Sequence, residues 1–444
     1  MSTTEPRRRY NIFLLIMLLA LLNYIDRGAM SYAAASITSE YGLNRAQWGA
    51  LLGYFGYGYL FGALCGGFLA DGLGPRKVWL WAAGSWSILA MATAYAGDLG
   101  IALFGGSALA GFAVIRIVFG FAEGPAYSAI NKSISRWAAP KERGFVVALG
   151  LVSTPLGALL TAPIASGLQY ATGGWRAMFI ILGVVSLVVL FFLMRVFTDT
   201  PQSNKYISDE EKAYLAQEKA KEEQAKPGNT DDSASVRVPW WSYFKSRTLV
   251  LNALAYFSFM YVNFLLLTWT PKYLEDQFHF NLSSLWYMGM IPWVGACFTV
   301  LLGGRISDAI YKSTGSLVKA RSLFAAVCLL CTSVCFFFVS KAETVWVAVG
   351  LLTLANAINS LPNSVFWAVV IDTAPATRTG AFSGMTHAVA NTAAIVAPTL
   401  TGYLTMQYGY SSMFIAAAVA TGVGVLAMLF VRPGQTNWAA MAVK

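Results

Sequence analysis

The chain has 444 residues, of which 57% are hydrophobic and only 12% are charged. A soluble domain carries about 25% charged residues and could not bury this much apolar surface in one core. Disorder is excluded as well, because disordered chains are poor in hydrophobic residues. A net charge of +10 would suggest nucleic acid in a soluble protein, but here the basic residues lie between apolar segments. We therefore expect a lipid bilayer and no nucleic acid around this chain.

Twelve apolar segments are long enough to cross a membrane, which takes about 20 apolar residues for a helix. In chain order they are 11–37, 48–69, 76–96, 104–131, 144–170, 175–197, 248–272, 284–306, 320–340, 344–370, 380–407 and 411–432. The sequence predicts an all-α membrane protein with six helices in residues 10–197, a polar central loop in 198–247 and six helices in 248–432.

The two halves repeat each other. GGFLAD at 66–71 matches GGRISD at 303–308, and PIASGL at 163–168 matches PTLTGY at 398–403, in the same order along the chain. A tandem repeat of this kind is typical of secondary transporters, whose substrate site lies between the repeats near the middle of the membrane. We therefore expect a transport site between the two six-helix halves.

The basic residues indicate the orientation. Of 31 Lys and Arg residues, only Arg45, Arg176, Lys272 and Lys341 fall on the side opposite the termini, apart from two arginines inside predicted helices. Cytoplasmic loops are enriched in Lys and Arg. We expect a multi-pass protein of a bacterial inner membrane with both termini and the central loop in the cytoplasm.

Four charged residues lie inside apolar segments of the first half: Asp26, Arg27, Arg116 and Glu123. A charge in hydrocarbon costs at least about 2.5–3.5 kcal/mol, so such a residue normally faces a cavity or a partner. Arg116 and Glu123 are two helical turns apart, about 10 Å along one face, so each can meet a group on the first helix. The repeat equivalent of Asp26 is the neutral Asn263, which places the predicted ion coupling in the first half.

Two interpretations of these four residues remain open. They can form a structural salt-bridge cluster, or a proton relay together with an anchor for an anion. Burial favours the protonated form of a carboxyl group and a nearby arginine favours the ionised form, so a carboxyl between these influences can take up and release a proton. An arginine suits an anionic substrate because its planar fork donates two parallel hydrogen bonds to a carboxylate.

Several motifs carry a family resemblance. GFLADGLGPRK at 67–77, with a weaker copy GRISD at 304–308, resembles the second-loop motif of the major facilitator superfamily. RRRY at 7–10, NYIDR at 23–27, Arg116 with Glu123-Gly-Pro-Ala, SRWAAPKERG at 135–144 and LTWTPKYL at 267–274 resemble the anion:cation symporter family. That family includes carriers of galactonate, hexuronate, glucarate, tartrate and phthalate, and the galactonate-type proton symporters show the most similar pattern.

The resemblance implies roles for particular residues. Asp26 and Glu123 match the protonating carboxylates, and Arg116 matches an arginine coupled to them. Substrate contacts are implied for Arg27, which would hold the substrate carboxylate, and for Tyr24, Tyr59 and Trp367. For Trp367 a packing role is the alternative.

The sequence departs from the galactonate pattern at two positions, where Thr154 replaces a glutamine and His387 replaces an asparagine. Both would touch the substrate hydroxyl groups, so the departures argue against galactonate itself. His387 can contact the ligand or be a buried packing residue.

A further set of charges is expected to form inter-helix ion pairs that gate the transporter, with Arg378 as the partner of Asp372. This set contains Asp71, Arg76, Lys77, Arg136, Arg143, Asp308, Asp372 and Arg378. No catalytic or metal-ligand cluster appears in the sequence, so we expect no enzyme, no metal and no cofactor other than a coupling proton.

The sequence and the resemblance together predict a monomeric, proton-coupled symporter that imports a small organic anion, first of all a sugar acid such as a hexonate or hexarate. An aromatic or dicarboxylic acid such as phthalate or tartrate is the alternative substrate. Export, or a sensor that does not transport, is the alternative role.

Overall fold

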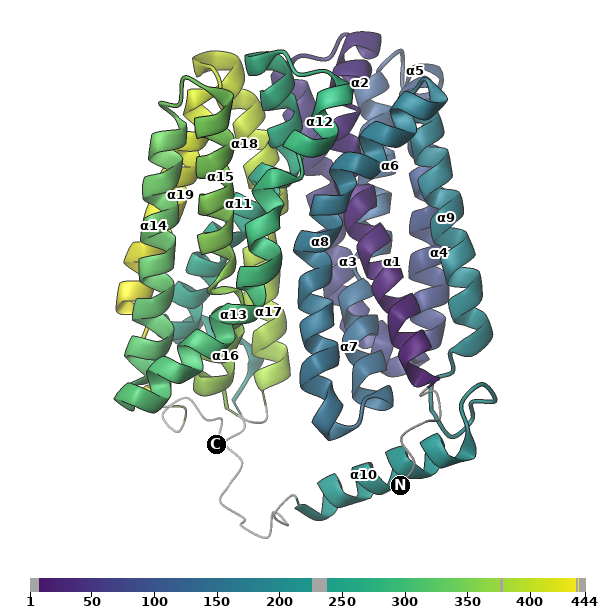
Figure 1. Cartoon of the computed structure of the whole chain (residues 1–444), viewed down its shortest axis with the longest axis vertical. Helices are drawn as coiled ribbons and strands as arrows, with labels where there is room; N and C mark the ends of the chain where they lie inside the picture. The colour runs from purple at the N-terminus through teal and green to yellow at the C-terminus, as the bar shows by residue number, and fades with distance from the viewer. Residues whose placement is uncertain (1–7, 226–237, 376–377, 437, 439–444) are drawn as a thin grey trace.

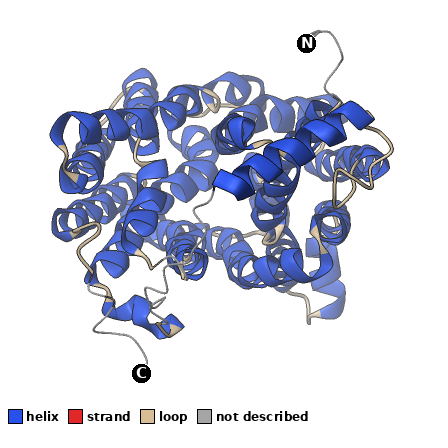
Figure 2. Cartoon of the chain, turned by 90° about the horizontal axis from the view of Figure 1, so that it is seen from below, coloured by secondary structure: helices blue, strands red, loops and turns tan. Residues whose placement is uncertain are grey.

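The computed structural model describes residues 8–225, 238–375, 378–436 and 438, and this part of the chain contains helices but no strand (Figures 1 and 2). The first half consists of α1 (Arg9–Tyr32), α2 (Ala34–Tyr41), α3 (Arg45–Leu73), α4 (Pro75–Thr93), α5 (Ala96–Leu103), α6 (Ala108–Glu123), α7 (Ala126–Trp137), α8 (Pro140–Thr172) and α9 (Trp175–Val196). Helix α10 (Asp209–Ala225) follows in the central loop.

The second half begins with the short helix η1 (Trp240–Lys245). It continues with α11 (Arg247–Phe278), α12 (Leu282–Met288), α13 (Ile291–Thr314), the π-helical turn η2 (Val318–Leu323), α14 (Phe324–Val339), α15 (Val345–Ser360), α16 (Asn363–Thr373), α17 (Thr379–Asn391), α18 (Ala393–Tyr408) and α19 (Ser411–Phe430). In Figure 1 the two halves stand side by side, with α10 beneath the first half. Part of the predicted central loop, 226–237, lies outside the described residues.

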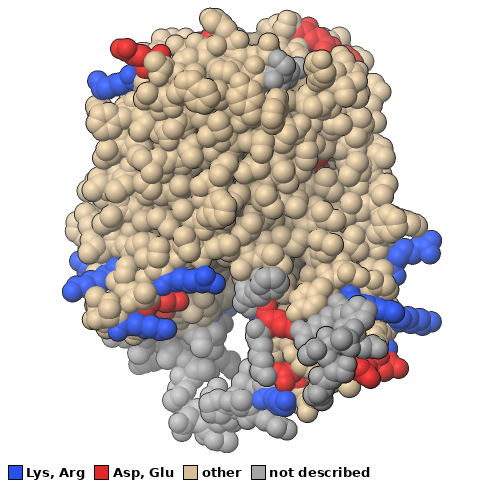
Figure 3. Space-filling view, viewed as in Figure 1, with Lys and Arg blue, Asp and Glu red and all other residues tan. Residues whose placement is uncertain are grey.

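The described helices account for every predicted membrane segment. They form ten spans that are long and apolar enough to cross a membrane. Four of these spans join two consecutive elements (α6 with α7, α12 with α13, η2 with α14, and α15 with α16), and α4 with α5, bent by 74°, can form one more. Helices α17 and α18, which meet at Thr392, cover the remaining predicted segment, 380–407. On the face in Figure 3, almost all visible charged side chains lie at the two ends, with an uncharged band between them. The chain is therefore a multi-pass membrane protein.

Glycines on α3 allow its neighbours to approach closely. A Cβ atom at Gly58 or Gly62 would clash with carbonyl oxygens of α6, so α3 and α6 pack backbone to backbone within the first half. A Cβ atom at Gly49 would lie 2.5 Å from the Pro398 carbonyl oxygen of α18. Small residues serve this purpose in membrane helices. One helix thus positions α6 within its own half and also contacts the other half.

The two halves meet on the side opposite α10, at the top of Figure 1. There Arg45 Nη2 lies 3.3 Å from Asp276 Oδ2, Arg45 Nη1 donates to the Thr405 carbonyl at 3.3 Å, and its guanidinium stacks on Tyr410 at 4.7 Å. Within the described residues, these bonds of Arg45 are the only hydrogen bonds between α1–α9 and α11–α19. Gly289 of the second half adds to this contact between the halves by packing against Tyr32 of the first half.

A second polar network on this side stays within the first half. Arg176 pairs with Glu40 at 2.6 Å and with Asp98 at 3.1 Å. The hydrogen bond from Arg176 holds the pKa of the Glu40 carboxyl below its usual range. This network therefore ties α2 and α5 to α9 while leaving the contact between the halves to Arg45.

On the α10 side, Arg9 joins the central loop to the first half. Its guanidinium is 2% exposed and lies 2.6 Å from Glu142 and 2.9 Å from Glu211, and it stacks on Tyr214. The Ser208 hydroxyl caps the start of α10 by accepting from the Glu211 amide at 3.3 Å. A buried arginine with two carboxylate partners fixes α10 against the ends of α1 and α8.

Candidate functional site

The four predicted intramembrane charges come together between α1 and α6. Arg27 Nε donates to Glu123 Oε2 at 2.5 Å, and the side chains are 4% and 0% exposed. Asp26 and Arg116 are 1% and 3% exposed, and the charge of Arg116 acts on both carboxyl groups. The prediction that an α6 residue meets a group on the first helix is therefore confirmed for Glu123, whereas the contacts of Arg116 are with Phe55 and Phe119.

This cluster leaves polar atoms without partners. Arg27 Nη2, Glu123 Oε1 and both carboxyl oxygens of Asp26 are buried and make no hydrogen bond within the protein. A buried donor or acceptor without a partner costs about 1–3 kcal/mol. These atoms can therefore accept or donate further hydrogen bonds, either to water or to a bound molecule.

Aromatic rings enclose the two arginines. The guanidinium carbon of Arg27 lies 4.4 Å from the ring centre of Tyr59 and 5.0 Å from those of Tyr24 and Phe55. The Arg116 guanidinium lies 5.3 Å from the same Phe55 ring. Cation–π contacts of this kind strengthen where water is excluded. Tyr24 and Tyr59 thus stand beside Arg27 as the resemblance implied, whereas Phe55 was not predicted.

Hydroxyl groups continue the site along the first half. The Tyr127 hydroxyl donates to the Tyr24 hydroxyl at 3.1 Å and lies 2.9 Å from Thr154 Oγ1. Tyr127 therefore joins two predicted residues, although it was not itself predicted. Its position four residues after Glu123 was the available signal, because residues four apart share a helix face.

The second half contributes a wall of rings. His387 lies 5.4 Å from Trp367 and 6.2 Å from Tyr256, measured between ring centres. Tyr256 lies on α11, and α11 packs against α1, the helix that carries Tyr24 and Arg27. Tyr256 was not predicted, although it precedes Asn263 by two helical turns on the same helix.

The predicted gate charges lie on the α10 side and bridge helices within each half. Lys132 pairs with Asp71 at 2.6 Å, and Arg136 lies 3.8 Å from Asp199. Arg76 donates to the Met194 carbonyl at 2.8 Å. Lys77 is exposed and Arg143 is half-buried at the start of α8. The first-half gate charges thus link α3 with α7 and bind the segment after α9.

One predicted gate pair is wrong. Asp372 lies 3.2 Å from Arg321, which also pairs with Asp308 at 2.9 Å. Arg378 instead donates from Nε to the Val238 carbonyl at 2.8 Å. Arg378 lies beyond the end of α16, where it reaches the segment before η1, whereas Arg321 at η2 faces both carboxylates. Sequence proximity to Asp372 misled the prediction.

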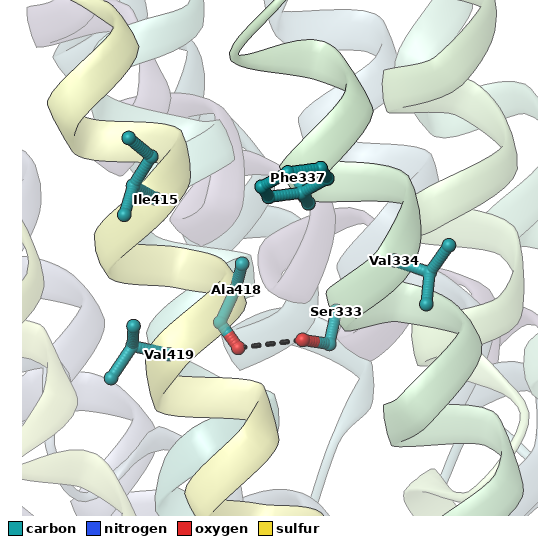
Figure 4. A pocket seen from close by; sticks show the side chains of 6 residues that line it. All are labelled: Ser333, Val334, Phe337, Ile415, Ala418 and Val419. Atoms are coloured by element: carbon teal, nitrogen blue, oxygen red, sulfur yellow. Dashed lines mark hydrogen bonds between the residues drawn. The ribbon is translucent and has the colours of Figure 1, made fainter.

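A separate hollow lies between α14 and α19 (Figure 4). It is lined by Ser333, Val334, Phe337, Ile415, Ala418 and Val419. Ser333 Oγ donates to the Ala418 carbonyl at 2.7 Å, and Val419 is 61% exposed. The hollow shares no residue with the charged cluster, and its exposed apolar lining is typical of a lipid-facing groove. Among the described residues there is also no group of His, Cys, Asp and Glu arranged to hold a metal.

Comparison with known proteins identifies the family. The model of the Major Facilitator Superfamily matches residues 16–391. The chain belongs to the Major Facilitator Superfamily. It is 29% identical to the hexuronate transporter of Bacillus subtilis (strain 168), over 95% of this chain and 94% of the relative. It is 30% identical to the probable sulfoacetate transporter SauU of Cupriavidus necator, over 96% and 94%. Both names describe carriers of organic anions, the class of protein that the motifs predicted.

Solved structures of this superfamily share the fold. A bacterial homolog of the human lysosomal transporter Spinster matches with a TM-score of 0.74 at 16% identity, covering 96% of this chain and 97% of that one. The D-xylose-proton symporter matches with a TM-score of 0.73 at 17% identity, covering 96% and 99%. The predicted fold class is therefore confirmed. The family match and the relatives show that the chain is a membrane transporter.

Proposed function

We propose that this transporter imports a small organic anion, first of all a sugar acid, together with protons. The observation that carries the proposal is the buried Arg27, whose Nη2 has no partner while its Nε is held by Glu123. A free guanidinium edge among Tyr24 and Tyr59 suits a carboxylate, and the phenol hydroxyl groups suit a hydroxylated body. The hexuronate transporter among the relatives supports this substrate class.

Protons and substrate would bind together at this site. While Glu123 is ionised, it occupies one edge of Arg27 at 2.5 Å. Protonation of Glu123 removes its negative charge, so the positive charge of Arg27 becomes available to an anion. Asp26, with both oxygens unpartnered, is the second proton acceptor, and Arg116 sets the field around both carboxyl groups. Each proton taken up thus strengthens the attraction for the substrate.

The location follows from the distribution of charge. We place the α10 side in the cytoplasm of a bacterial cell, because the loops on that side carry most of the Lys and Arg residues. The contact between the halves at Arg45 then closes the outer side, and the site would release its substrate inward. The protein would act as a monomer with no cofactor other than the coupling proton.

Binding and uptake measurements test the proposal. Purified protein should be stabilised against heat by D-glucuronate or D-gluconate, but not by the corresponding amide or by glucose. In liposomes, an inwardly directed proton gradient should drive accumulation of the acid, and a protonophore should abolish it. Equal stabilisation by acid and amide would contradict the anion assignment. Accumulation that persists after the gradient collapses would contradict proton coupling.

A further inference from the structure

We propose that the substrate carries a single negative group and presents an uncharged end to the second half. This inference rests on the proposed function and narrows its substrate class to monoanions, such as hexonates and hexuronates, against dianions such as hexarates. The inference follows from the positions of the cationic side chains, because a negative group of the substrate can bind only where a cation is available.

The second half offers no cation at the level of the site. In the described part of α11–α19, the Lys and Arg side chains lie towards helix ends or between helices: Lys272 and Lys341 on one side, and Arg247, Arg305, Lys312, Lys319, Arg321 and Arg378 on the other. His387 of α17 lies away from these ends and packs against Trp367 and Tyr256. A second carboxylate of the substrate would therefore have to be received by this imidazole.

The imidazole of His387 is already engaged by the side chain of Asn391. Asn391 Nδ2 lies 3.2 Å from Nδ1 and 3.1 Å from Nε2 of His387. An amide nitrogen can only donate, so the ring nitrogen that it bonds accepts and carries no proton. Trp367 and Tyr256 pack against the same ring. Hydroxyl groups or an apolar end of the substrate can contact these rings. A second carboxylate would be desolvated there without a cation to pair with, which is unfavourable.

The first half also has capacity for one anion. Its two arginines face two carboxyl groups, and Arg27 is the one that stands among the tyrosines, with Nη2 unfilled. Arg116 has an unpartnered Nε, but its guanidinium lies against Phe55 and Phe119 and its charge is opposed by Asp26. One substrate carboxylate can therefore be bound by Arg27, and the opposite wall stays uncharged.

Matched acid pairs test the inference on the purified full-length protein. D-gluconate and D-glucarate differ only at one end, where glucarate has a second carboxylate; glycolate and sulfoacetate form a short pair. Calorimetric titration at pH 7 measures the affinity of each acid. In any pair that binds, the monoanion should bind at least about tenfold more tightly than its dianion, which is the difference expected for one charge-assisted hydrogen bond that the second carboxylate cannot make. His387→Arg should raise dianion affinity by at least about tenfold, because a guanidinium can stack on the same rings and bind a carboxylate.

His387→Gln is the matched neutral variant and should keep the preference for the monoanion. A dianion that binds the unmodified protein as tightly as its monoanion overturns this inference and leaves the organic-anion proposal intact. No binding by any of the four acids or by D-glucuronate contradicts the proposed function itself. A folded His387→Arg protein, judged by its melting temperature, whose dianion affinity is unchanged contradicts the assignment of His387 to the substrate wall. If that variant does not fold, the unmodified protein and His387→Gln still decide the preference.

Discussion

The two halves of this transporter repeat one fold but differ in what they bury. The first half encloses Asp26, Arg27, Arg116 and Glu123 near its centre, whereas the second half has His387 and aromatic rings at the same level. At the repeat position of Asp26, Asn263 donates to the Phe259 carbonyl of its own helix at 3.0 Å. Buried charges are costly in a membrane, and this cluster of them lies in the first half. We therefore assign the proposed binding of the proton and the anion to the first half, and an uncharged contact surface for the substrate to the second half.

The largest effect should follow from removing the anion anchor. Arg27→Lys keeps the charge but loses the planar fork, so we expect binding of the best acid to weaken at least about tenfold, or about 1.4 kcal/mol. Arg27→Ala should weaken binding further, as measured by calorimetry. Arg195→Ala is the matched control, because Arg195 is exposed and stacks on Phe191; its affinity should not change. An unchanged dissociation constant in Arg27→Ala would show that Arg27 does not bind the substrate.

Removing the proton acceptor should separate coupling from binding. Glu123→Gln mimics the protonated carboxyl, so we expect loss of gradient-driven accumulation while exchange of substrate across liposomes persists. The matched control is Glu40→Gln, which removes the carboxylate that pairs with Arg176 at the surface. An exposed pair contributes about 0–1 kcal/mol, so accumulation should continue. Full accumulation by Glu123→Gln would refute its role in coupling.

Exchanging Asp26 and Asn263 tests whether the coupling carboxylate can act from the second half instead of the first. Asp26→Asn should lose most gradient-driven accumulation. The double variant with Asn263→Asp should not recover it, because Asn263 lies on the helix of the second half and Arg116 acts on Asp26. Uptake in liposomes under a fixed proton gradient measures both variants. Recovery in the double variant would show that either half can hold the coupling carboxylate.

The smallest effect should come from Arg45 and Asp276, which form the one ion pair between the halves in the described part of the chain. Arg45 and Asp276 are 38% and 24% exposed, and exposed pairs are worth about 0.2–1 kcal/mol. Arg45→Gln should lower the melting temperature slightly, and the double variant with Asp276→Asn should show no further loss from the pair. A thermal double-mutant cycle measures this coupling. A coupling energy well above this range would make the pair a principal lock between the halves.

Hydropathy and charge were sufficient to predict the architecture. Each predicted segment lies in helix because the length of an apolar run is a local property, and the four buried charges stand out in any window of sequence. The motifs then indicated the superfamily, which the family match over residues 16–391 confirms. The meeting of α1 and α6 was also predictable, since unpaired charges in a membrane require partners.

Partner choice depended on the tertiary structure. The sequence alone determined that Arg27 and Glu123 are buried, but which carboxyl pairs with Arg27 depends on how α1 and α6 rotate against each other. The same applies to Phe55, Tyr127 and Tyr256, which look like ordinary apolar or aromatic helix residues, and to Asp372, whose partner Arg321 comes from another helix. Helical periodicity specifies a face, whereas the crossing of helices determines which side chains meet across it.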